Sequence, residues 1–321
     1  MTTQTPGIHH VTGIVGDAQA SVDFYAGTLG LRLLRTTVNY EDLLQYHLYF
    51  GTGAGRPGSV LTVFPDPEGV PGRPGKPGYE SVSLAVPSGS SEYWRDRLTD
   101  RGVDVDRIRP EERFGDRGLR VSDPAGTAVE LLETDDSGDP WTDGPVPESA
   151  AIRGLYGATA TPTDPYGAAS VLETLGFEYE AEMNDRVRYR APGERATAVD
   201  LLDRDAPYLR EGPGTLHHVA VRAPDREALL GWHDLFRDRE YEVSRVKDRH
   251  FFHSLYVRGP GGLLVELATE EPTPDGPRGP GFADPDADGH ATDRYLPGRF
   301  AEDRDLIEGQ LPPIEPPADE G

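Results

Sequence analysis

Hydrophobic and polar positions divide the chain into four segments of similar design. In the fourth, the apolar run at 215–221 predicts a strand, and apolar side chains at helical spacing predict a helix over about 226–239. Asp225 can cap this helix at its start. Three strand-like runs follow, and the Gly-Pro-Gly-Gly turn at 259–262 separates the last two. The pattern therefore predicts the order βαβββ.

The first segment repeats this order. A strand at 7–14 precedes a helix that is capped near Asp17 and ends at Gly30. The three strands that follow are expected around 32–40, 44–51 and 59–64. The second segment covers about 79–134 and the third about 152–204, where Pro165 suits a first helical turn.

A closing phrase supports the repeat. It reads AVELLE at 128–133, AVDLLD at 198–203 and LVELAT at 264–269. The sequence predicts an α+β fold of four βαβββ modules. Two domains of two modules each are expected at 6–134 and 152–270, separated by an acidic linker and followed by a proline-rich acidic tail at 271–321 with a short helix near 300–309.

The charge of the chain limits the kinds of binding partner that we expect. The 321 residues include 56 acidic and 32 basic ones, for a net charge of −24, and only Lys76 and Lys247 are lysines. Such a chain repels phosphates and anionic lipid heads, so we expect neither nucleic acid nor membrane as a partner. The same composition suits the salt-rich cytoplasm of a halophile, although it also fits a merely acidic protein.

The absence of certain residue types and segments excludes further classes of site and of protein. The chain has no cysteine, which rules out disulfides, thiolate metal sites and cysteine nucleophiles. No apolar run approaches the ~20 residues of a membrane span, and the first residues lack the features of a signal peptide. We therefore expect a cytoplasmic protein, and the sequence leaves open whether it forms a homo-oligomer.

Histidine pairs mark the first and fourth segments. His9 and His10 lie in the opening strand of the first, and His217 and His218 in that of the fourth. The closing phrase of the fourth carries Glu266, whereas the first has Thr62 at the matching position. Two histidines and one carboxylate are the facial triad of non-haem Fe(II) oxygenases. To share one metal, the two outer segments must pack together.

The alternation of side chains along a strand does not show which histidine of each pair would bind the metal. Neighbouring side chains point to opposite faces of a strand, so one histidine of each pair faces the presumed cavity and the other faces away. Thr12 shares a face with His10. Glu130 and Asp200, at the closing positions of the two middle segments, have no histidine partners. We expect them to be structural.

An ordered set of phrases resembles a known family. GIHHVTG, FYAGTLGLRLLRTTVNYED, YHLYFG, LHHVAV, DRHFFHSLYVRGPGGLLVELAT and QLPPIEP span nearly the whole chain. They resemble the vicinal oxygen chelate superfamily of glyoxalases, bleomycin-resistance proteins and extradiol ring-cleaving dioxygenases, and within it the hydroquinone-type dioxygenases. The resemblance implies two β-barrel-like units of paired modules.

The resemblance also implies roles. It makes His10, His218 and Glu266 the metal ligands, with His9 and His217 nearby, while Thr12 is expected at the cavity because it shares a face with His10. It places Arg249 and Tyr256 in the active site as cationic and phenolic groups. From the residues alone, the alternatives are packing for His9 and His217, β propensity for Thr12, a surface ion pair for Arg249 and a core aromatic for Tyr256.

The expected activity is Fe(II)-dependent opening of a hydroquinone or catechol ring by O₂, with Mn(II) as an alternative metal. The expected ligands are thus a small aromatic substrate and O₂. Two other functions stay open: a glyoxalase-like lyase or isomerase with a redox-silent metal, and a resistance-type protein that only binds an aromatic compound. His47, His233 and His250 are expected to be ordinary structural histidines.

Overall fold

The computed structural model describes the chain except residues 1–3, 136–137, 277–280, 285–288 and 319–321. The four predicted modules are all present. Module one holds β1 (Ile8–Val15), α1 (Ala18–Val22) continued by a π-helical turn (Asp23–Thr28), β2 (Arg32–Asn39), β3 (Asp42–Gly51) and β4 (Val60–Pro65). Module two holds β5 (Gly78–Pro87), α2 (Ser91–Asp100), β6 (Asp106–Ile108), β7 (Gly118–Ser122) and β8 (Ala128–Thr134).

The second half follows the same plan. Module three holds β9 (Gly154–Thr161), α3 (Pro165–Leu175), β10 (Glu178–Met183), β11 (Arg186–Arg190) and β12 (Ala198–Leu202). Module four holds β13 (Thr215–Ala223), α4 (Arg226–Asp238), the short β14 (Glu242–Val243) and β15 (Lys247–Asp248), β16 (His253–Arg258) and β17 (Leu264–Thr269). The tail ends in a 3₁₀ turn (Gly298–Asp303) and α5 (Arg304–Gln310), close to the predicted helix.

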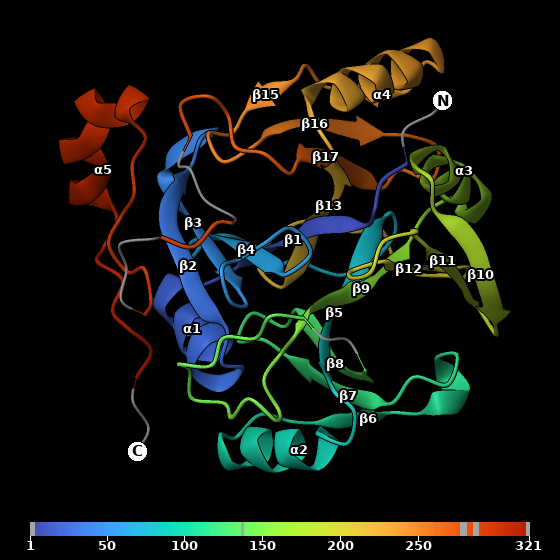
Figure 1. Cartoon of the computed structure of the whole chain (residues 1–321), viewed down its shortest axis with the longest axis horizontal. Coiled ribbons are helices and arrows are strands. Elements are labelled where there is room, and N and C mark those ends of the chain that lie inside the picture. Colours follow the sequence, from blue (N-terminus) through green and yellow to red (C-terminus); the bar gives the residue numbers. More distant parts are fainter. Residues whose placement is uncertain (1–3, 136–137, 277–280, 285–288, 319–321) are drawn as a thin grey trace.

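Helix starts match the sequence signals. The side chain of Asp17 accepts a hydrogen bond from the Ala20 amide, and that of Asp225 accepts one from the Ala228 amide. Both carboxylates satisfy backbone donors that the first helical turn leaves unpaired. Pro165 occupies the first turn of α3, as predicted. Figure 1 shows the module helices around the outside of the strands.

Strand pairing joins the modules in a crossed order. β1 pairs antiparallel with β13, so modules one and four form an outer unit with the strand order β2-β3-β4-β1-β13-β17-β16. β5 pairs antiparallel with β9, so modules two and three form an inner unit with the order β6-β7-β8-β5-β9-β12-β11-β10. The packing of the first segment against the fourth is confirmed. The domain bounds drawn along the chain stay a prediction.

The two units are open sheets. A pair between Leu216 and Tyr79 links β13 to β5 and joins them. Among the described strands, no pairing connects the two edges of either unit, so the expected barrel-like closure is absent although the α+β class is confirmed. At the edge strand β2, the tail takes the place of a further strand, because the Ala291 and Tyr295 amides donate to the carbonyls of Leu33 and Thr36.

Four matched pairs confirm the repeat. In the parallel pairings of each module, Thr12 lies opposite Thr62, Ser83 opposite Glu130, Thr159 opposite Asp200 and Ala220 opposite Glu266. The closing carboxylates therefore occupy one structural position. Within the described residues, no helix combines the length and apolarity that crossing a membrane would need.

Candidate metal centre

Three neighbouring strands bring the predicted ligands together. His10 on β1 lies opposite Ala220 of β13, and Ala220 lies beside Glu266 of β17, so all three residues sit in one row across the sheet. His218 is two residues before Ala220, on the same face. One ligand atom from each of His10, His218 and Glu266 lies within 4.8 Å of the others, and all three side chains are buried.

The contacts within the cluster face a common point. Glu266 Oε2 lies 2.7 Å from His218 Nε2 and 3.3 Å from His10 Nε2. The other carboxylate oxygen, Oε1, is buried, and no described residue forms a hydrogen bond with it. A buried, unpaired carboxylate oxygen is costly unless something binds it. Two imidazole nitrogens and a carboxylate fit a divalent metal such as Fe(II), and they leave coordination positions open.

Burial sets the charge states. It lowers the pKa of His218 to about 4, so this imidazole is neutral at physiological pH. Burial opposes the ionisation of Glu266, but the contacts to His218 and His10 hold its pKa well below the ordinary value. Neutral imidazoles and an ionised carboxylate are the forms that bind a metal without first releasing a proton.

Two β-bulges place the other histidines. In the β1–β13 pairing, Ile8 and His10 lie opposite the consecutive Val221 and Ala220, so His9 is an extra residue on β1. On the other strand, His218 and Leu216 lie opposite consecutive residues of β1, and His217 is the extra residue. A bulge turns its extra residue out of the regular alternation.

Each bulged histidine therefore contacts its neighbour. Nδ1 of His9 lies 2.8 Å from Nδ1 of His10, and Nδ1 of His217 lies 2.6 Å from Nδ1 of His218. If Nε2 of His10 and of His218 bound a metal, each ring would carry its proton on Nδ1 and would donate it to the bulged histidine. Each contact would then fix the tautomer of its metal-binding histidine.

Thr12 also touches the cluster. Its hydroxyl lies 3.0 Å from Nε2 of His218 and 2.8 Å from the hydroxyl of Thr62. The position that carries a carboxylate in the other three modules thus holds a hydroxyl pair here. His9 is buried against Phe252 and Phe282, and it does not line the cleft described next.

A cleft of about 410 Å³ opens beside His218. Tyr256 lines it, with its ring edge-on to His218 at 5.5 Å between centroids, and Arg249 Nη2 lies 3.3 Å from the Tyr256 hydroxyl. His217 is half-buried in the wall, and its Nε2 lies 3.8 Å from Glu211 Oε2. Four of the predicted residues therefore line the cleft: His217, His218, Arg249 and Tyr256. Glu266 and Thr12 contact His218 from behind the cleft, His10 contacts Glu266, and His9 contacts His10.

Four charged residues that line the cleft were not identified as site residues from the sequence: Glu41, Asp66, Glu211 and Lys247. Glu41, in the turn between β2 and β3, accepts contacts of 2.9 Å from both Lys247 and Arg249. Lys247 lies on β15, two residues before Arg249, and this closeness in sequence was a usable signal. Nothing in the sequence pointed to Glu41 or Glu211. His47 is half-buried between the rings of Tyr49 and Phe64, and its Nε2 has no hydrogen-bond partner among the described residues, so its structural role stays a prediction.

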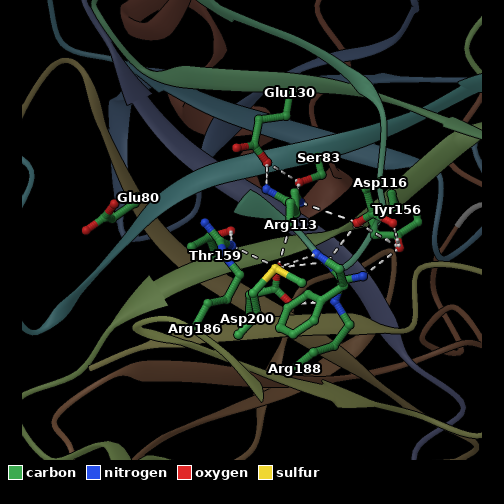
Figure 2. A network of polar contacts seen from close by, with 12 residues as sticks. Glu80, Ser83, Arg113, Asp116, Glu130, Tyr156, Thr159, Arg186, Arg188 and Asp200 are labelled. Carbon is green, nitrogen blue, oxygen red and sulfur yellow. Dashed lines mark hydrogen bonds and ion pairs between the residues drawn. The ribbon is translucent and has the colours of Figure 1, made fainter. Parts of the chain in front are cut away.

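The inner unit carries an ion-pair network at the corresponding place (Figure 2). Arg113 contacts Glu130 and lies 3.5 Å from Asp200, so one guanidinium bridges the two closing carboxylates. Arg186 and Arg188 also bind Asp200, at 2.8 and 2.7 Å. Glu130 and Asp200 thus bind arginines, and the positive charge between them is the guanidinium group of Arg113.

Bulges recur in this unit. Tyr79 and Ser81 of β5 lie opposite consecutive residues of β9, which makes Glu80 an extra residue. Tyr156 is the extra residue on β9, where Gly157 and Leu155 lie opposite Ser83 and Leu84. The inner unit therefore repeats the backbone of the metal centre without its histidines.

Comparisons with known proteins agree with this fold. The model of the Glyoxalase/Bleomycin resistance protein/Dioxygenase superfamily matches residues 7–131 and 171–267. MhqO of Bacillus subtilis strain 168, whose name provisionally calls it a ring-cleaving dioxygenase, is 37% identical over 98% of both chains. Chlorohydroquinone/hydroquinone 1,2-dioxygenase of Sphingobium indicum is 34% identical over 82% of this chain and 84% of its own length.

Solved structures give the same picture. A crystal structure from Bacillus subtilis, provisionally titled a dioxygenase, superposes with a TM-score of 0.88 at 36% identity and covers 98% of both chains. Glyoxalase I from Zea mays reaches a TM-score of 0.61 at 15% identity, over 82% of this chain and 92% of its own. This second likeness concerns the fold alone.

Proposed function

The chain belongs to the glyoxalase/bleomycin resistance protein/dioxygenase superfamily, and on this premise we propose that it is an Fe(II)-dependent ring-cleaving dioxygenase of the extradiol type. Its substrate would be a hydroquinone or a catechol. The observation that carries the proposal is the buried cluster of His10, His218 and Glu266, with an unpaired carboxylate oxygen, beside a cleft lined by Arg249 and Tyr256.

Iron held by these three side chains would supply open coordination positions and the redox chemistry that O₂ activation requires. The protein's own contribution is orientation. His9 and His217 accept the Nδ1 protons of His10 and His218 and keep both Nε2 atoms directed to the metal position. Thr12 contacts one of these atoms and limits how the His218 ring can turn.

Cleft residues would handle the substrate. Arg249 provides a fixed positive charge next to the Tyr256 hydroxyl, which suits the negative charge that develops on oxygen. Burial raises the pKa of Tyr256 well above its ordinary value, so this phenol stays protonated and can donate. A ring bound in the cleft would then be held by donors on one side.

The contact between His217 and His218 decides whether His217 would act as a base or as a hydrogen-bond donor. While His217 accepts the proton of His218 at Nδ1, its own proton is on Nε2, which faces the cleft near Glu211. His217 is then a donor to a substrate oxygen. His9 lies outside the cleft and is excluded as a contact of the substrate.

Metal reconstitution tests the proposal. The chain, stripped of metal, should take up O₂ with hydroquinones or catechols after anaerobic loading with Fe(II), and should stay inactive with Zn(II). His10→Ala, His218→Ala and Glu266→Ala should each lose stoichiometric iron while the circular dichroism spectrum is unchanged. His233→Ala is the matched control, because this histidine lies on α4 and contacts Asp234. Full iron content in His10→Ala would refute a centre shared between the outer modules.

The same assay separates the alternatives. A glyoxalase-like lyase or isomerase would turn over with a redox-silent metal and without O₂, and a resistance-type protein would bind an aromatic compound without consuming it. Thr62 speaks against a glyoxalase-type centre, since it offers a hydroxyl bonded to Thr12 where a further carboxylate ligand would be needed.

A further inference from the structure

A second cleft, of about 730 Å³, opens in the inner unit. Its charges reverse the balance of the chain: six arginines and four carboxylates line it, whereas the whole sequence has 32 basic and 56 acidic residues. The arginines come from β6, the loop after it, β7, β11 and the segment after β12, and they are Arg107, Arg109, Arg113, Arg120, Arg186 and Arg204.

Part of the ion-pair network of Figure 2 lines this cleft, through Arg113, Glu130 and Arg186, and the rest of the network lies behind them. Its buried carboxylates are Glu130 and Asp200, and the partly buried Asp116 joins them. Four guanidiniums contact these three groups, from Arg113, Arg120, Arg186 and Arg188. Arginine stays charged at any physiological pH, so the network keeps an excess positive charge.

Two network arginines direct unused donors to the open side. Arg120 contacts Glu130 through Nε and Nη2, and among the described residues its Nη1 has no hydrogen-bond partner. Arg186 contacts Thr159 and Asp200 through Nη1 only, although it also lines the cleft. Planar guanidinium groups with two parallel N–H donors match carboxylate and phosphate oxygens.

The rim adds further positive charge. Arg107 is exposed and pairs with no acidic group in the described part of the chain. Arg109 is exposed too, with Glu112 at 3.6 Å.

We propose that this cleft is a binding site for a small multivalent anion that carries carboxylate or phosphate groups. The anion would lie between the rim arginines and the free donors of Arg120 and Arg186. The site is separate from the metal centre, because the two clefts share no lining residue and belong to different units. It does not depend on the activity proposed above.

Calorimetric titration of the full-length chain tests the site. Succinate and inorganic phosphate are the probes, and sodium chloride keeps the ionic strength constant so that screening does not change during the titration. Saturable binding of either probe is expected, and which one binds identifies the carboxylate or the phosphate class. His218→Ala should bind equally well, since it removes a metal ligand and leaves the inner unit intact.

Two double variants test whether the rim arginines bind the anion. Arg107→Ala with Arg109→Ala removes the rim charges and should weaken binding about tenfold, as expected for the loss of charge-assisted hydrogen bonds. Arg95→Ala with Arg101→Ala is the matched control, because it removes two charges from α2 in the same unit and outside the cleft. Equal loss in both double variants, loss in His218→Ala, or no saturable binding of either probe would overturn the proposal.

Discussion

Replacing Arg113 by methionine should strongly destabilise the inner unit. The Arg113 side chain is 3% exposed and joins Glu130 to Asp200. Removing one member of a buried ion pair leaves an uncompensated charge and typically costs about 3–5 kcal/mol. Asp200 keeps Arg186 and Arg188, while Glu130 keeps only Ser83 and Arg120, which is 45% exposed on its side chain.

These remaining partners place the expected loss at the lower end, about 3 kcal/mol, or roughly two powers of ten in the unfolding equilibrium. Urea unfolding followed by circular dichroism measures it as a lower midpoint at an unchanged slope. Arg113→Met combined with Glu130→Leu should recover most of the loss, because replacing a buried pair by apolar groups is often neutral. Iron content should match that of the parent chain.

Arg95→Met is the control, since Arg95 lies on the surface of α2 and such changes stay within about 0.5 kcal/mol. The reasoning fails if Arg113→Met unfolds at the midpoint of this control. It also fails if the double variant is less stable than the single one, because Glu130 would then contribute independently of the arginine.

Three further outcomes are expected. His217→Ala and Tyr256→Phe should retain iron but slow O₂ uptake by roughly 10²–10⁴-fold, and near-parental turnover would assign both side chains to packing. The melting temperature should fall between 1 M and 0.1 M salt as the Debye length grows from ~3 to ~10 Å, and no change would contradict the halophile interpretation. Burial alone would raise the pKa of Glu130 and Asp200, but arginines hold both below their ordinary values. Their contribution to stability is therefore complete above pH ~4 and is lost as the pH falls through the lowered values; a flat urea midpoint down to pH 3 would contradict this.

Local signals predicted much of the fold. Capping carboxylates at Asp17 and Asp225 act within one helical turn, so their neighbours in sequence are enough to interpret them. The repeated closing phrase aligned the modules correctly, because each module places it at the same parallel pairing. That alignment matched the two histidine pairs to each other and to Glu266, and the family resemblance then chose His10 and His218 within the pairs.

The sequence did not predict the features that depend on two strands at once. A bulge is defined by its partner strand, so the alternation rule wrongly turned His9 and His217 away from their neighbours. The sequence also failed to predict that the sheets stay open. The tail covers the edge strand β2 through backbone hydrogen bonds, and any residue type can make such bonds, so no side chain signals this contact. Arginine is long enough for Arg113 to reach another module, and no sequence spacing reveals that contact.

The crossed pairing of modules also imposes an order on synthesis. β1 leaves the ribosome long before its partner β13, because His10 and His218 are 208 positions apart. At 5–20 residues per second, this separation is a wait of about 10 to 40 seconds. Throughout it the nascent module one presents an unpaired strand edge, while modules two and three can already complete their own unit. A metal ion shared by His10, His218 and Glu266 could therefore be captured only by a chain whose last module has emerged, and unfinished chains would not compete for it.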